Sequence, residues 1–128
     1  MHIGVPKETK THENRVGLTP ESVAEFTRRG HQVTVEANAG QGIGKTDDDY
    51  RAAGAEISGD SAAIFAEAGM IVKVKEPQSA EREMLREGQV LFTYLHLAPD
   101  AEQTRDLVES GAICIAYETV TGADGRGL

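Results

Sequence analysis

The chain is poor in cysteine and has no tryptophan. Its 128 residues include one cysteine, four prolines and no tryptophan. Because Cys114 stands alone, it cannot form a disulfide within the chain or a zinc site built on several thiolates. This excludes a small secreted scaffold held together by disulfides, and a cytoplasmic location is the expectation. The low numbers of proline and tryptophan favour no class of protein.

Basic residues and long apolar runs are also scarce. Thirteen lysines and arginines against 21 aspartates and glutamates give a net charge of −8. A chain of this charge repels nucleic-acid phosphates and anionic lipid, so we expect no nucleic-acid partner and no membrane-surface binding. No apolar run approaches the roughly 18 residues of a transmembrane helix, and the N-terminus lacks the apolar core of a signal peptide. The chain is therefore predicted neither to span a membrane nor to carry a visible export signal.

What the chain does contain suits one globular domain. Hydrophobic residues make up 39% of it, and the 14 glycines bring the apolar share into the range typical of folded soluble domains. One domain over residues 1–128 fits this length, and two ordinary domains do not. Disordered and collagen-like chains are excluded by the same composition.

Short apolar runs alternate with helical segments along the whole chain. Strands are predicted at residues 2–5, 31–36, 70–74, 89–95 and 112–117, with a weaker one at 55–57. Five helices are predicted to begin near residues 19–20, 46–47, 60, 79 and 99–100, and to end at Gly30, Gly54, Gly69, Gly88 and Gly111. This alternation predicts an α/β fold: an open, doubly wound, mainly parallel sheet of the Rossmann or flavodoxin-like type with helices on both faces.

The segment after the first predicted strand is a long polar loop with an excess of basic side chains. Residues 6–18 exceed the roughly 2–6 residues of an ordinary βα loop, which is typical of a functional or mobile segment. Ligands of open parallel sheets bind beyond the carboxyl ends of the strands, and an arginine there can hold a carboxylate by two hydrogen bonds. We expect Arg15 to bind a small anionic molecule. The alternative is an ion pair of Arg15 with Glu8 or Glu13 in a solvated loop.

Two other strands are followed by titratable side chains. Lys73 and Lys75 share one face near the end of their strand, where the Lys75 ammonium can polarise a carbonyl or bind a carboxylate. His96 follows the next strand, and an imidazole takes up and returns a proton near neutral pH. The alternatives are lysines that extend along the strand to water and a histidine with a structural role. Because Arg15, Lys75 and His96 follow three strands of one sheet, their convergence favours a catalytic site.

Three further features are weaker. The glycines within residues 40–44 do not match the G-x-G-x-x-G spacing, and no helix begins at the third of them, so a turn is predicted there. The acidic run 47–49 is explained by the dipole of a helix start, and no metal site is predicted. Glu118 comes just after the last strand and is expected to line the same cleft, with no role assigned.

Four blocks of sequence together resemble one family. They are IGVPKE at 3–8, ENRVGLTP at 13–20, VKVKEP at 72–77 and LFTYLHLA at 91–98. With these blocks in this order, the chain is similar to the N-terminal, substrate-binding part of L-alanine dehydrogenases, within the alanine dehydrogenase and nicotinamide nucleotide transhydrogenase family. The resemblance covers essentially the whole chain.

This resemblance implies reversible oxidative deamination of L-alanine to pyruvate and ammonium, with NAD as the cofactor. His96 then matches the catalytic acid/base, and Arg15 and Lys75 match the side chains that bind the substrate. The family continues into a nucleotide-binding domain, so no cofactor-binding residue is expected in this chain. We expect a fragment or separate domain that binds NAD weakly and has no activity alone, with exposed apolar surface. The full-length protein is expected to form a homo-oligomer.

Other interpretations stay open. Within the family these are the nucleotide-binding subunit of transhydrogenase and the saccharopine dehydrogenases, and the presence of both Lys75 and His96 favours the alanine enzyme. An alternative of another class is a non-enzymatic flavodoxin-like binding or signalling module, such as a phospho-receiver. Lys7 and Glu8 argue against it, because they stand where a receiver needs an acidic pair.

Overall fold

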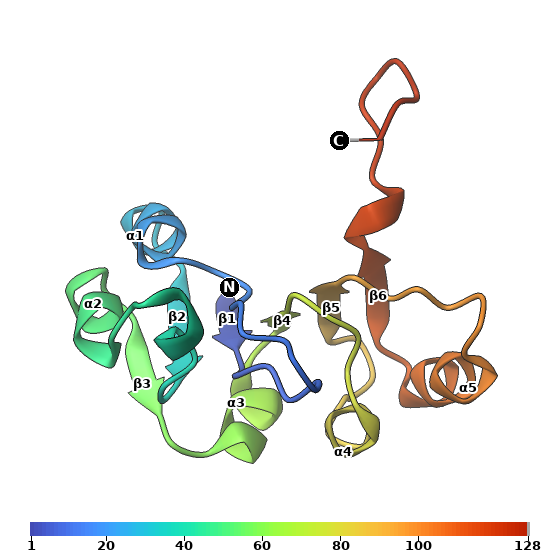
Figure 1. The fold of residues 1–128 in the computed structure, drawn as a ribbon, viewed down its shortest axis with the longest axis horizontal. Coiled ribbons are helices and arrows are strands. Elements are labelled where there is room, and N and C mark those ends of the chain that lie inside the picture. The colour runs from blue at the N-terminus through green and yellow to red at the C-terminus, as the bar shows by residue number, and fades with distance from the viewer. Residues whose placement is uncertain (128) are drawn as a thin grey trace.

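A computed structural model describes residues 1–127 as a six-stranded sheet with helices on both faces (Figure 1). The strands are β1 (His2–Val5), β2 (Gln32–Glu36), β3 (Glu56–Ser58), β4 (Met70–Val72), β5 (Val90–Thr93) and β6 (Ile113–Ala116). The α-helices are α1 (Pro20–Arg28), α2 (Asp47–Ala52), α3 (Ser61–Glu67), α4 (Ser79–Arg82) and α5 (Ala101–Ser110), with 3-10 turns η1 (Gln41–Ile43) and η2 (Tyr117–Thr119). All neighbouring strands are parallel, which confirms the predicted fold class.

One of the predicted helix ends is wrong. The helix expected over 79–88 is a single turn, because the chain bends after Arg82 and buries Leu85 in the core. Gly69 directly follows the C-cap of α3, as predicted, but its φ is not positive. Instead, the backbone at Ala68 is extended and the Gly69 N–H donates to the His2 carbonyl at 2.9 Å, so the chain passes directly into pairing with β1. The other four predicted terminal glycines, Gly30, Gly54, Gly88 and Gly111, do have positive φ.

Each face of the sheet has its own hydrophobic core, as expected when strand side chains alternate. On one face, residues of α1 and α2 pack against β1 and β2, and fully buried Tyr50 lies at the centre of this cluster. On the other face, α3 and α5 pack against β4 and β5 around Phe65 and Leu91. Gly4 of β1 faces α3, and a Cβ there would lie 2.7 Å from Cγ2 of Ile64. Only glycine therefore lets α3 pack this closely on the central strand.

The order of the strands, β3-β2-β1-β4-β5-β6, sets where a ligand can bind. The chain first builds β1, β2 and β3 outward in one direction, and then returns past β1 to build β4, β5 and β6 in the other. The segments that follow β1 and β4 therefore leave the sheet at the point where the direction reverses. Open parallel sheets bind ligands at such a switch point, beyond the carboxyl ends of the strands. The two segments here are the 14 residues between Val5 and Pro20, which form the long loop predicted above, and the shorter turn between Val72 and Ser79.

One part of the sheet has no helix over it. On β6 at the edge, Ile113 is 55% exposed and Ile115 is 38% exposed, because α1 and α2 cover only the half of that face formed by β1, β2 and β3. Apolar surface is thus exposed, as the sequence led us to expect. Among the described residues, none of the helices has the length and apolar character needed to cross a bilayer.

Candidate active site at the carboxyl edge of the sheet

A buried charge cluster joins the two segments at the switch point. Lys73 donates from Nζ to Oε1 of Glu81 at 2.8 Å and to Oε2 of Glu8 at 3.3 Å, and the three side chains are 0%, 5% and 1% exposed. The alternative in which Lys73 extends to water is wrong. β4 ends at Val72, and the Lys73 side chain that follows it is enclosed between the carboxylates of Glu8 and Glu81. Glu8 after β1 and Glu81 on α4 therefore hold the turn after β4 from both sides.

The backbone that leads to Lys75 is held by side chains from three other segments. Glu8 accepts hydrogen bonds from the N–H groups of Val74 at 2.7 Å and Lys75 at 3.4 Å. Thr93 donates from its hydroxyl to the Lys75 carbonyl at 2.8 Å, and Tyr117 donates to the Val74 carbonyl at 2.6 Å. Burial raises the pKa of the Glu8 carboxyl, although the Lys73 ammonium and these N–H groups lower it in part.

Lys75 and His96 both contact the ring of Tyr94. The Lys75 ammonium lies 4.2 Å from the ring centroid, a cation–π distance, and the His96 imidazole stacks on the same ring at 5.6 Å and 13°. The structure thus links these two predicted site residues through a shared aromatic neighbour. Sequence reasoning missed Tyr94, although its place two residues before His96 near a strand end was a signal that both side chains could share a face.

The turn that carries His96 is strained. His96 has φ +46°, in the left-handed region that residues other than glycine seldom adopt. The N–H groups of Leu95 and His96 both donate to Oε1 of Glu118, at 3.1 and 2.9 Å. Desolvation alone would raise the pKa of the Glu118 carboxyl, but hydrogen bonds from backbone N–H groups, led by that of His96, lower it overall.

Arg15 forms the ion pair that we considered as the alternative, and its partner is Glu13. Nε of Arg15 donates to Oε1 at 2.8 Å and Nη2 donates to Oε2 at 2.7 Å. These hydrogen bonds lower the pKa of Glu13 to about 2. The Arg15 side chain is still 63% exposed, and Glu13 uses only one side of the guanidinium. Because a guanidinium has five N–H donors, the Nη1 and Nη2 end can still bind a carboxylate with two hydrogen bonds.

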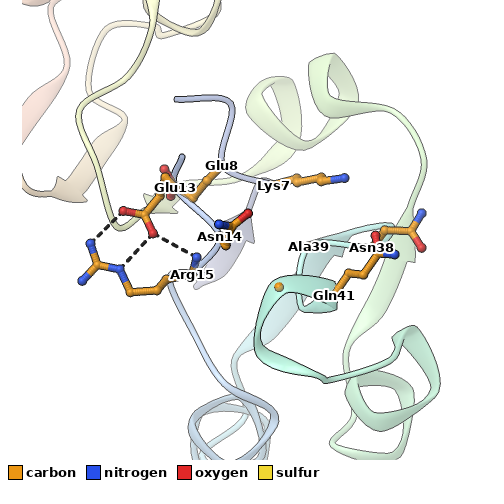
Figure 2. A pocket seen from close by; sticks show the side chains of 9 residues that line it. Lys7, Glu8, Glu13, Asn14, Arg15, Asn38, Ala39 and Gln41 are labelled. Atoms are coloured by element: carbon orange, nitrogen blue, oxygen red, sulfur yellow. Dashed lines mark hydrogen bonds and ion pairs between the residues drawn. The ribbon is translucent and has the colours of Figure 1, made fainter. Parts of the chain in front are cut away.

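A pocket of about 240 Å³ lies beside Arg15, between the loop after β1 and the segment after β2 (Figure 2). Figure 2 shows Glu13 and Arg15 on one side of it and Asn38 and Gln41 on the other. Neither Lys75 nor His96 lines this pocket. The hydrogen bonds and charge of Arg15 lower the pKa of Glu13, and the charge of Lys75 adds to this effect. We call Arg15, Lys75, Tyr94 and His96 the edge site.

The residues described do not fit the phosphates of a dinucleotide. The glycine cluster 40–44 forms η1 and a left-handed turn at Gly44, as the sequence predicted. Its glycines serve close packing, because a Cβ on Gly42 would lie 2.0 Å from the Asn14 carbonyl oxygen. The loop after β1 leads to α1 only after 14 residues, whereas a dinucleotide site needs a glycine-rich turn directly into a helix. Within residues 1–127, no three His, Cys, Asp or Glu side chains are grouped to hold a metal ion.

Residues 4–128 match the family described as "Alanine dehydrogenase/PNT, N-terminal domain". The chain belongs to this family. The predicted resemblance is thereby confirmed, and curated relatives agree with it. The alanine dehydrogenase of Mycobacterium tuberculosis H37Rv is 52% identical over 125 residues, which are 98% of this chain and 34% of that protein. The alanine dehydrogenase of Methanococcus maripaludis is 52% identical over 124 residues, 97% of this chain and 33% of that protein.

Solved structures of the alanine dehydrogenase/PNT family have the same fold. An L-alanine dehydrogenase superposes with a TM-score of 0.95 at 46% identity, over 98% of this chain and 35% of that one. A transhydrogenase from Sinorhizobium meliloti gives a TM-score of 0.88 at 30% identity, over 94% of this chain and 36% of that one. The chain therefore spans about a third of the length of the relatives it matches, and it is more similar to the alanine dehydrogenases than to this transhydrogenase.

Proposed function

We propose that this chain forms the substrate-binding part of an NAD-dependent L-alanine dehydrogenase, which interconverts L-alanine and pyruvate plus ammonium. The observation that carries the proposal is that Lys75 and His96 both contact the Tyr94 ring at the carboxyl edge of the sheet. The similarity to proteins named alanine dehydrogenase, at about 50% identity over nearly the whole chain, supports the same substrate.

Each side chain of the edge site has a distinct role in this proposal. Arg15 binds the carboxylate of alanine or pyruvate through the end of its guanidinium that Glu13 leaves available. Lys75 faces the carbonyl or carbinolamine oxygen, where its ammonium stabilises developing negative charge. His96 takes a proton from the reacting group and returns it, as an imidazole can near neutral pH. Anchoring the carboxylate holds the α-carbon in place for reaction.

The cofactor belongs to a different part of the protein in this proposal. The described residues offer no cradle for the phosphates of NAD, and the curated relatives are about three times as long as this chain. We assign NAD binding to a second domain that faces the edge site, and we expect the isolated chain to lack turnover. A homo-oligomer in the cytoplasm, with L-alanine or pyruvate as the small-molecule partner, completes the proposal.

A steady-state assay of the full-length protein tests this function. We expect NADH to form when NAD and L-alanine are both present, and NADH to be consumed with pyruvate and ammonium. Activity only with lysine-derived substrates would instead identify a saccharopine dehydrogenase, and hydride transfer only between nucleotides would identify a transhydrogenase. An absence of any redox activity, with binding of small molecules retained, would favour the non-enzymatic module.

A further inference from the structure

Glu118 has no role in the proposed reaction, yet it holds the segment on which His96 lies. Its Oε1 accepts hydrogen bonds from the N–H groups of two successive residues, Leu95 at 3.1 Å and His96 at 2.9 Å. Successive backbone N–H groups beside a left-handed residue form a small concavity that binds anions. Here the anion is a side chain of the same protein, and it comes from η2, which directly follows the neighbouring strand β6.

The parallel register between the last two strands explains why Glu118 reaches this turn. Thr93 of β5 pairs with Ala116 of β6 as the last pair of both strands, and two residues beyond it on each segment the Leu95 N–H reaches the Glu118 carboxylate. Leu95 is 2% exposed, and its carbonyl accepts a hydrogen bond from Gln103 of α5 at 2.8 Å. The turn is thus anchored in the core on one side and by Glu118 on the other, while His96 itself is exposed.

The conformation of His96 needs such support. A φ of +46° is unfavourable for a residue with a Cβ, and it persists only where neighbouring groups enforce it. This φ sets the direction in which the imidazole leaves the backbone, and the imidazole stacks on Tyr94, which also faces the Lys75 ammonium. If the turn relaxed to an ordinary conformation, the imidazole would lose its contact with the Tyr94 ring.

We propose that Glu118 is a positioning residue for His96: its carboxylate binds the two N–H groups of the turn and so fixes the imidazole against Tyr94. The inference rests on the proposed function, because there His96 exchanges the proton with the substrate. Glu118 itself touches no reacting atom. Since an amide oxygen can accept the same two hydrogen bonds, the role depends on an acceptor at this position and not on its charge.

The test compares three variants of the full-length protein in the L-alanine assay. Glu118→Ala removes the acceptor and is expected to lower kcat about 10- to 100-fold, the scale of a catalytic group displaced by about 1 Å, while KM for L-alanine changes less than about twofold. Glu118→Gln keeps an acceptor oxygen and should retain kcat within about threefold. Glu109→Gln, an exposed glutamate of α5 away from the edge site, is the matched control and should equal the wild type.

Two more measurements separate positioning from a general loss of structure. In a His96→Ala background, Glu118→Ala should cause no further loss of kcat, because Glu118 acts only through His96. Hydrogen exchange of the amides of Leu95 and His96 should become faster in Glu118→Ala and stay unchanged in Glu118→Gln. The exchange measurement needs no turnover, so it tests the contact even if the protein lacks alanine dehydrogenase activity, an outcome that would refute the proposed function alone.

The inference is overturned if Glu118→Ala keeps the kcat of the Glu109→Gln control, or if its loss is in KM instead of kcat. It is also overturned if Glu118→Gln loses as much activity as Glu118→Ala, because the charge and not the hydrogen bonds would then matter. Additive losses from Glu118→Ala and His96→Ala would show that Glu118 acts independently of the imidazole.

Discussion

Replacing Lys73 by methionine tests whether the buried charge cluster holds the two segments of the edge site together. In the wild type, one ammonium lies between two carboxylates, Glu8 and Glu81, and all three side chains are at most 5% exposed. Methionine fills a similar volume without charge. Both carboxylates would then be buried without a cation, although each keeps backbone N–H donors, from Val74 for Glu8 and from Gln78 for Glu81.

The expected loss of stability is large for a single substitution. Removing one partner of a buried ion pair costs about 3–5 kcal/mol, because the remaining charge is left uncompensated. Glu8→Gln provides the contrast. This variant keeps the ion pair between the Lys73 ammonium and the Glu81 carboxylate, at 2.8 Å. We therefore expect a smaller cost in stability of about 1–2 kcal/mol, the scale of a lost or weakened hydrogen bond.

The pH dependence gives a second signature of the same cluster. Burial already raises the pKa of Glu8, and the Lys73 ammonium opposes this shift, so Lys73→Met raises that pKa further. A carboxyl whose pKa is higher in the folded state binds protons more tightly there, so its unfavourable contribution to stability grows as pH rises through that folded pKa. The deficit of Lys73→Met relative to the wild type should therefore be larger at pH 8 than at pH 5.

Urea unfolding followed by circular dichroism measures these free energies, with extrapolation to water at both pH values. Lys45→Met is the control, since the ion pair of Lys45 with Glu21 is exposed and its loss should change stability little. The reasoning is refuted if Lys73→Met unfolds within about 1 kcal/mol of the wild type at pH 8, well under the cost of an orphaned buried charge. A cost of Glu8→Gln greater than that of Lys73→Met would refute it as well.

Further variants of the full-length protein test the edge site itself. His96→Ala should lower kcat about 10²- to 10⁴-fold without lowering the melting temperature, and an unchanged kcat would exclude the acid/base role. Arg15→Ala should mainly raise KM for pyruvate and L-alanine, as expected when binding shared by the ground and transition states is lost. Tyr94→Leu removes the ring that faces Lys75, and should lower kcat/KM about tenfold. In an NMR titration of the chain, the pKa of Glu13 should be about 2, and it should return toward 4.5 in Arg15→Ala. The stability that this ion pair contributes is complete above pH 4.5 and is lost as the pH falls toward 2.

Local hydrogen bonding explains why most elements could be predicted from the sequence. The side chains of Thr19, Thr46, Asp60 and Asp100 cap α1, α2, α3 and α5 by accepting from a backbone N–H three residues later. Such contacts depend only on neighbouring residues, so they can be inferred without a fold. The helix predicted over 79–88 failed because burial of Leu85, a contact with distant residues, ends it after one turn.

Single residues of the candidate site could be predicted from the sequence, but the side chains that contact them could not. Arg15, Lys75 and His96 could each be selected because polar side chains follow apolar strands in the sequence. Their partners could not. Lys73 and Lys75 are two residues apart and of the same type, yet the first is buried between carboxylates and the second lies over an aromatic ring. Both lysines lie beyond the end of β4, and what separates their environments is which distant side chains reach each one: Glu8 and Glu81 for Lys73, and Tyr94 for Lys75.

The sequence by itself determined the alternation of strands and helices, the scarcity of cysteine and basic residues that excluded whole classes of protein, and the family. The tertiary structure alone decided the strand order that places the segments after β1 and β4 at one switch point, and the register that brings Glu118 to His96. The reason is physical: strand pairing joins residues far apart in the chain, so the geometry of the edge site depends on contacts that no local pattern contains.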